Sequence, residues 1–162
     1  MRRRFLLALR DDPKVQRALE IWQQVAFAGR ETPRELKRFL NQVRFAATAF
    51  EAGSAVAARL KVAELDEAGM VMCGALAHCA PGYVEGLMAL EEVVNDTAVF
   101  QVGWKLAESG ALRRDTTPTM DPLTLIGGAM KVHGETFAGS LPLQKSAMKV
   151  FVDLWPGQRG EA

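Results

Sequence analysis

The chain has 162 residues, of which 49% are hydrophobic and 24% are charged, and its formal net charge is +1. This composition is ordinary for a globular protein and argues against the chain being a disordered tail, and the length suits one domain. Because the net charge is so small, bulk charge predicts no polyanionic partner, and any functional positive charge must be local.

Cysteine content and apolar runs bear on the compartment. Cys73 and Cys79 are too few for a disulfide framework and form no paired-cysteine metal motif, so reduced, buried thiols in a cytoplasmic protein are the simpler interpretation. The start, Met1–Arg10, resembles a secretory signal, but two aspartates follow directly, so we expect no signal peptide. The richest apolar run, Ala68–Ala80, is too short to span a bilayer, and we expect no membrane insertion.

Apolar residues at helical spacing, together with capping signals, predict an all-α fold, an irregular bundle of about six to eight helices. In chain order we expect helices over 12–29, 32–53, 55–80 (with a candidate break near 67–69), 83–94, 98–109, 121–128 or beyond, and 143–155. Loops are expected over 113–120 and 134–142, and no strand is convincing, since 150–153 fits a helix better.

The predicted elements group into a single helical domain over residues 1–155. It contains a helical hairpin (11–53), a helical middle (54–112) and C-terminal helices (121–155), and residues 156–162 are expected to form a flexible tail.

Motifs of a complete enzyme are absent from the sequence. No glycine is followed by lysine, so the phosphate-binding P-loop is missing, and neither Gly-x-Gly-x-x-Gly nor Gly-x-Ser-x-Gly occurs. Asp153 follows an apolar run, as magnesium-binding acids do in P-loop enzymes, but such an acid also needs the phosphates that a P-loop would hold. Cys73, His78 and Cys79 are close in sequence, yet zinc needs three or four converging ligands, and core packing is the favoured interpretation. We therefore expect no catalysis by this chain alone and no cofactor of its own.

The segment Thr32–Phe45 (TPRELKRFLNQVRF) is the most informative. Thr32 is a predicted N-cap, Pro33 occupies the first helical position and Glu35 completes a capping box. One side of the helix carries an apolar stripe of Leu36, Phe39, Leu40, Val43, Ala46, Ala47 and Phe50. The opposite side carries Arg34, Lys37, Arg38, Asn41 and Arg44.

Arg34 lies in the first turn, where the helix dipole favours anions over cations. A cation at this position slightly destabilises the helix, which indicates that Arg34 binds a phosphate or carboxylate from another part of the structure. From physics alone, a simply solvated basic face is the alternative that must be weighed first.

The pattern Pro-Arg-x-x-Lys-Arg-Phe-x-Asn that begins at Pro33 resembles a motif in the C-terminal helical region of KAP-family P-loop NTPases. Related Pro-Arg helix starts occur in the lids of AAA+ proteins. The preceding amphipathic helix with Trp22 also suits that context, and the resemblance covers about residues 11–50.

The resemblance implies that Arg34 acts as a sensor arginine that approaches nucleotide phosphates. Lys37, Arg38 and Asn41 would contact the nucleotide, the NTPase core or a partner. The core, with its P-loop and magnesium-binding acid, is missing from this sequence. ATP–Mg would therefore bind only together with an NTPase core, supplied in cis in a longer parent or in trans.

The sequence thus predicts a lid-like helical region, or a remnant, of a bacterial, cytoplasmic KAP-like NTPase. The alternative is an α-helical interaction or adaptor module that binds no nucleotide. Nucleic-acid binding through Arg2–Arg4 and the basic face is disfavoured by the near-neutral charge and the lack of interleaved aromatic residues.

Overall fold

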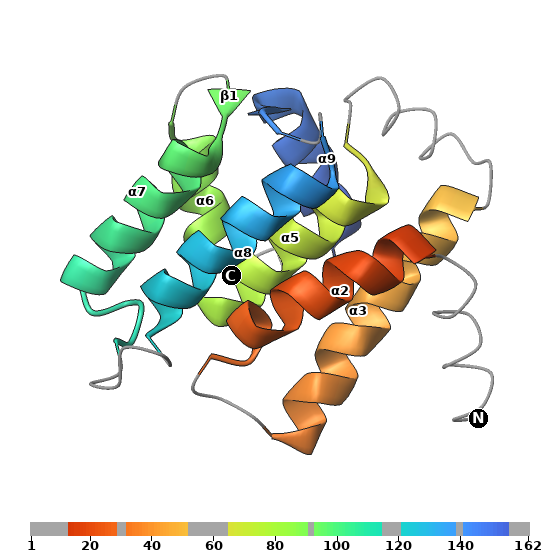
Figure 1. Ribbon diagram of the computed structural model, residues 1–162, viewed down its shortest axis with the longest axis horizontal. Coiled ribbons are helices and arrows are strands. Elements are labelled where there is room, and N and C mark those ends of the chain that lie inside the picture. Colours follow the sequence, from red (N-terminus) through yellow and green to blue (C-terminus); the bar gives the residue numbers. More distant parts are fainter. Residues whose placement is uncertain are drawn as a thin grey trace.

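The computed structural model describes residues 13–28, 32–51, 65–90, 93–114, 121–138 and 141–155. These ranges contain seven helices and one small antiparallel sheet (Figure 1), which confirms the predicted all-α bundle. The helices are α2 (Pro13–Ala26), α3 (Pro33–Glu51), α5 (Glu67–Cys79), α6 (Tyr83–Met88), α7 (Asp96–Glu108), α8 (Pro122–Thr136) and α9 (Lys145–Leu154). None of the helices in these ranges is long and apolar enough to cross a membrane.

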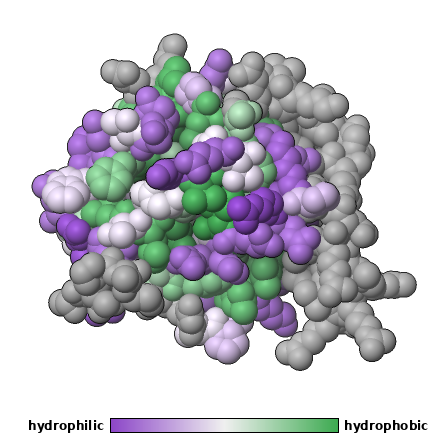
Figure 2. All heavy atoms as spheres, viewed as in Figure 1, coloured by the Kyte–Doolittle hydropathy of each residue, from purple (hydrophilic) through white to green (hydrophobic). Residues whose placement is uncertain are grey.

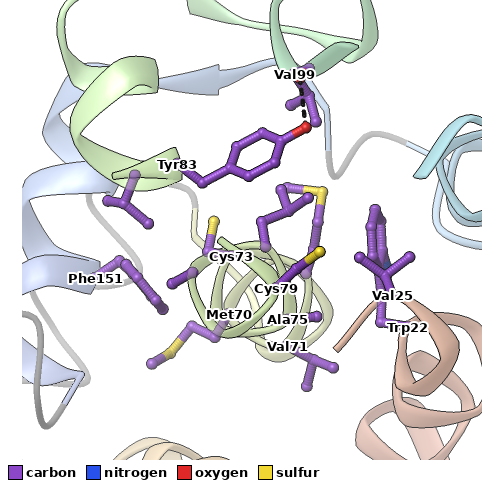
Figure 3. Close-up of a cluster of buried hydrophobic side chains, with 14 of the residues drawn as sticks. Trp22, Val25, Met70, Val71, Cys73, Ala75, Cys79, Tyr83, Val99 and Phe151 are labelled. Carbon is purple, nitrogen blue, oxygen red and sulfur yellow. Dashed lines mark hydrogen bonds between the residues drawn. The ribbon is translucent and has the colours of Figure 1, made fainter. Parts of the chain in front are cut away.

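Helix α5 forms the centre of the core. Every residue from Ala68 to Ala77 is buried, so this helix is apolar on all sides rather than along one stripe. Figure 3 looks along α5 and shows its side chains pointing outward in every direction into neighbouring helices. Asp66 caps the helix, and its carboxylate accepts a hydrogen bond from the backbone N–H of Gly69 at 2.7 Å. The break expected near 67–69 is therefore the start of α5, and residues 55–64 lie outside the described part of the chain.

The other helices cover α5. Helices α2, α3 and α6 pack directly on it, and α2 also packs on α8. Helix α7 contacts both α6 and α8, and α9 contacts α6 (Figure 1). Helix α2 ends at Ala26 and is followed by a turn at Phe27 and Ala28, slightly before the predicted stop at Gly29. Its buried side chains recur at helical spacing: Val15, Ala18, Trp22, Val25 and Ala26.

Two predicted helix boundaries were wrong because a short sheet replaces the helix ends. The helix expected over 83–94 ends at Met88, and Val93–Val94 forms strand β1. Strand β2 (Leu143–Gln144) pairs with it, and the last helix starts after this strand. In the register of the sheet, Val94 lies opposite Leu143, and both side chains are buried. Strands of two residues are too short to show alternation, so the sequence pattern could not reveal them.

Helix α8 is longer than its glycines suggested. It runs through Gly127 and Gly128 to Thr136, into the region expected to be turn-rich. Glycine in a helix interior costs stability, but this helix buries Ile126, Met130 and His133, which offsets that cost. The N-terminal boundary at Asp121 and the helical state of residues 145–154 agree with the sequence predictions.

One glycine of α5 is required by close packing. The Trp155 indole, at the end of α9, lies directly against the backbone of Gly74, and a Cβ at this position would overlap the indole ring. Trp155 itself is 2% exposed and stacks on Phe151, with ring centroids 5.1 Å apart. The absence of a side chain at Gly74 therefore lets the last helix close over the central one.

Gly74→Ala is expected to lower the free energy of unfolding by about 1–3 kcal/mol, because the added methyl overpacks a filled core. The matched control is Gly128→Ala, whose Cβ would meet nothing within 4 Å. That substitution should raise the free energy of unfolding by about 0.5–1 kcal/mol, since alanine favours a helix over glycine. Urea unfolding followed by circular dichroism measures both variants, and equal changes in the two would contradict the packing argument.

Candidate partner-binding face on helix α3

Thr32 caps α3 as predicted, but the described structure shows no return hydrogen bond from the Thr32 N–H to the Glu35 side chain, so the predicted capping box is half formed. The backbone N–H of Glu35 donates to the Thr32 hydroxyl oxygen at 3.3 Å, and the N–H of Leu36 donates to the Thr32 carbonyl at 3.0 Å. Pro33 is the first helical residue, and Arg34 follows it in the first turn. The cap therefore fixes where the helix begins and where Arg34 leaves the backbone.

Aromatic and aliphatic packing fixes how α3 is rotated. Phe39 and Val43 are buried, and α3 packs on α5. The Phe39 ring lies edge-on to Phe27, with centroids 5.6 Å apart, and the His78 ring of α5 is also 5.6 Å from it. These contacts hold one side of α3 against the core, so the opposite side must face outward.

The four predicted site residues lie on that outward side. Arg34, Lys37, Arg38 and Asn41 are all exposed, and at about 100° per residue they share the face opposite Phe39 and Val43. Within the described part of the chain, none of the four has an ion-pair partner. The structure thus brings the predicted residues together on one surface, which we call the basic face of α3; Arg44 is also exposed there.

Three residues of α3 depart from the sequence interpretation. Leu36 was assigned to the apolar stripe but is 43% exposed, although Phe39 and Val43 of the same stripe are buried. Glu35 turns inward, and its Oε2 atom is buried without a hydrogen-bond partner in the described structure. Phe45 was not singled out, yet it is 51% exposed, and its position seven residues after Arg38 could have placed it on the basic face. The side chains of Ala46, Ala47 and Phe50 lie outside the described residues.

The cysteines belong to the core. Burial raises the pKa of the Cys73 thiol to about 12, with a smaller contribution from Asp66, so the thiol stays protonated at neutral pH. Its Sγ contacts the Met148 sulfur at 3.7 Å, and Cys79 is also buried. Within the described ranges, no three His, Cys, Asp or Glu side chains are grouped so that they could hold a metal ion.

Asp121 is a buried acid that is paired with Arg114. It is 4% exposed and accepts hydrogen bonds from Arg114, Nε to Oδ1 at 3.2 Å and Nη2 to Oδ2 at 3.1 Å. The hydrogen bonds from Arg114 are the main reason that the pKa of Asp121 lies below its ordinary value. The same guanidinium lies 5.3 Å above the Trp104 ring. This set of contacts links the end of α7 to the start of α8.

A second buried polar contact joins α2 to α8. The Trp22 indole Nε1–H donates to Nδ1 of His133 at 3.0 Å, and both residues are fully buried. An acceptor at Nδ1 requires the neutral imidazole with its proton on Nε2. Burial is the main cause that lowers the pKa of His133, while Asp66 acts in the opposite direction and Lys14 in the same direction. Lys14 is itself 2.8 Å from the Asp66 carboxylate.

Comparison with known proteins adds no relative to this description: no protein-family model matches the chain, and neither does any curated protein or solved structure.

The lowered pKa of His133 predicts acid sensitivity. Between the folded-state pKa and the ordinary value of 6.5, the unfolded chain binds more protons than the folded one, so stability falls as pH decreases through this range. His133→Asn keeps an acceptor oxygen near the Nδ1 position but cannot be protonated. We expect the variant to show a smaller loss of unfolding free energy below pH 6.5 than the unsubstituted protein, measured by urea unfolding at a series of pH values. The same pH dependence in both proteins would show that His133 is not responsible.

Proposed function

We propose that this chain is the lid-like helical region, or a remnant, of a KAP-like P-loop NTPase and acts only together with an NTPase core. The observation that carries the proposal is the basic face of α3, which presents Arg34, Lys37, Arg38 and Asn41 on one outward side of a firmly anchored helix. These are the residues that match the family's motif. A cytoplasmic location belongs to the same proposal, because the core it would serve uses ATP–Mg.

The proposed role of Arg34 follows from its position. Its guanidinium is exposed in the first turn of α3, and in the described structure nothing neutralises it. When an NTPase core holds ATP–Mg against this end of the helix, Arg34 would approach the phosphates and stabilise the charge that develops during transfer. Lys37, Arg38 and Asn41 would hold α3 against the core. The core, not this chain, would supply the P-loop and the magnesium-binding acid.

The proposal predicts that Arg34→Ala, in a complex reconstituted with a candidate KAP-like core, reduces ATP turnover roughly 10- to 100-fold, because a charge-stabilising donor is lost. Calorimetric titration with ATP–Mg should detect nucleotide binding by the complex but not by this chain alone. Arg34→Lys should recover part of the turnover, since it restores the charge without the bidentate geometry.

The matched control is Arg17→Ala, which removes an exposed arginine from α2. Arg17 pairs with Glu20 at 3.0 Å and lies outside the basic face. Its replacement should leave ATP turnover unchanged. A complex that hydrolyses ATP equally well with and without Arg34 would remove the sensor role.

A second candidate, an α-helical interaction module that binds no nucleotide, is favoured by α7. Phe100 and Trp104 are 41% and 44% exposed and stand one turn apart, which places two large apolar side chains side by side at the surface. In the view of Figure 2, hydrophobic residues gather in the middle of the molecule with hydrophilic residues around them, whereas α7 lies at the left in the same orientation (Figure 1). Elution as a monomer at every concentration, without a co-purifying partner, would count against this candidate.

A further inference from the structure

The basic face of α3 contains an exposed aromatic side chain. Phe45 is 51% exposed, and it follows Asn41 by four residues and Arg38 by seven. Residues at these separations lie one above the other on a helix. Arg34, Arg38, Asn41 and Phe45 therefore form a single row along the outer side of α3, with the apolar member at one end.

Among the described residues of α3, the charges on the basic face are of one sign. Arg34, Lys37, Arg38 and Arg44 are exposed, and the acid that occurs between Pro33 and Phe45 is Glu35. Glu35 lies at the edge of the face, half-buried, with its Oε2 atom turned away from solvent. A complementary partner must therefore be acidic.

The convex shape of the basic face limits which kinds of acidic partner can bind it. The outer side of a helix is convex, so these side chains cannot enclose a small anion by themselves. Single-stranded nucleic acid is held by several aromatic side chains on which successive bases stack, whereas this face offers one, Phe45. Arginines beside an aromatic anchor are enriched where proteins bind one another.

We infer that the basic face of α3 docks an acidic amphipathic helix of a partner protein, with Phe45 as its apolar anchor. The row from Arg34 to Phe45 repeats at alternating spacings of four and three residues, the spacing with which one helix contacts another along its length. Glutamates of the partner helix pair with Lys37 and Arg38, and apolar residues at one end of it cover Phe45, which leaves Arg34 at the start of α3 for the nucleotide phosphates. The inference deepens the proposed function and rests on it, because it names the chemistry of the surface that the NTPase core or another partner must present.

The test uses a fluorescein-labelled synthetic helix of about 20 residues, long enough to be helical in water, that carries two rows of glutamate beside a leucine cluster. Binding to the full chain is measured by fluorescence anisotropy at low and at raised salt. Lys37→Glu/Arg38→Glu should weaken binding at least tenfold at low salt and less at raised salt, because salt screens exposed charges. Phe45→Ala should weaken binding about tenfold at both salt concentrations, since an apolar anchor is not screened.

The matched control is Lys145→Glu/Lys149→Glu on α9, which makes the same change in net charge at two exposed positions away from α3. This control should bind the peptide as the unsubstituted chain does. Circular dichroism verifies that each variant is folded; the residues replaced are exposed, so folding should be unaffected.

Several results would overturn the inference. These are equal affinity for a sequence-scrambled peptide, an equal loss in the α9 control, or an unchanged affinity in Phe45→Ala. Tighter binding of oligothymidine or of anionic phospholipid vesicles than of the peptide would assign the face to nucleic acid or to lipid instead. No nucleotide is present in this assay, so peptide binding can succeed where the Arg34 sensor role fails, and the reverse.

Discussion

The burial of α5 on all sides from Ala68 to Ala77 is the constraint on which the rest of the structure depends. A helix without a polar side must be covered in every direction, and here α2, α3 and α6 cover it directly. Small residues make this possible, since Gly74 lets the Trp155 ring lie against the helix backbone. The Tyr83 hydroxyl is buried as well, and it donates a hydrogen bond to the Val99 carbonyl at 3.2 Å (Figure 3). The surface helices are thus held in place by what they must cover, and this is what gives the outward faces their fixed orientation.

The outward orientation of the basic face of α3 follows from the packing of α3 on α5. Phe39 and Val43 meet α5, and their burial turns the arginines, lysine and asparagine outward. Few of the exposed residues contribute to the fold, so the face can be shaped by a partner without loss of stability. This separation is consistent with the proposal that α3 works against a second protein.

The sequence predicted those parts of the fold whose signals are local. Thr32 and Asp121 precede helices where expected, and helical spacing predicted the buried side of α2. Strands β1 and β2 were missed because each has two residues and its partner lies about fifty residues away in the chain, beyond the reach of any periodicity.

For the candidate site, the sequence predicted the shared face of Arg34, Lys37, Arg38 and Asn41, because position on a helix is set by spacing alone. It could not tell that Leu36 would be exposed, since exposure depends on tertiary packing and not on helical spacing. It could not give the inward turn of Glu35 either. Phe45 was overlooked for a different reason, as an aromatic residue is normally assigned to the interior unless its register is compared with that of the charges around it.

Contacts between residues far apart in the chain also affect the order in which parts of the fold can form during synthesis. Trp22 on α2 meets His133 on α8, 111 residues later, and Gly74 is covered by Trp155. During synthesis the most apolar helix therefore leaves the ribosome well before the residues that finish its enclosure. Until α6 and Trp155 emerge, the nascent chain carries an apolar helix that α2 and α3 cover but α6 and Trp155 do not, and exposed apolar surface of this kind is what chaperones bind. A fold centred on such a helix closes only once the chain up to Trp155 is available.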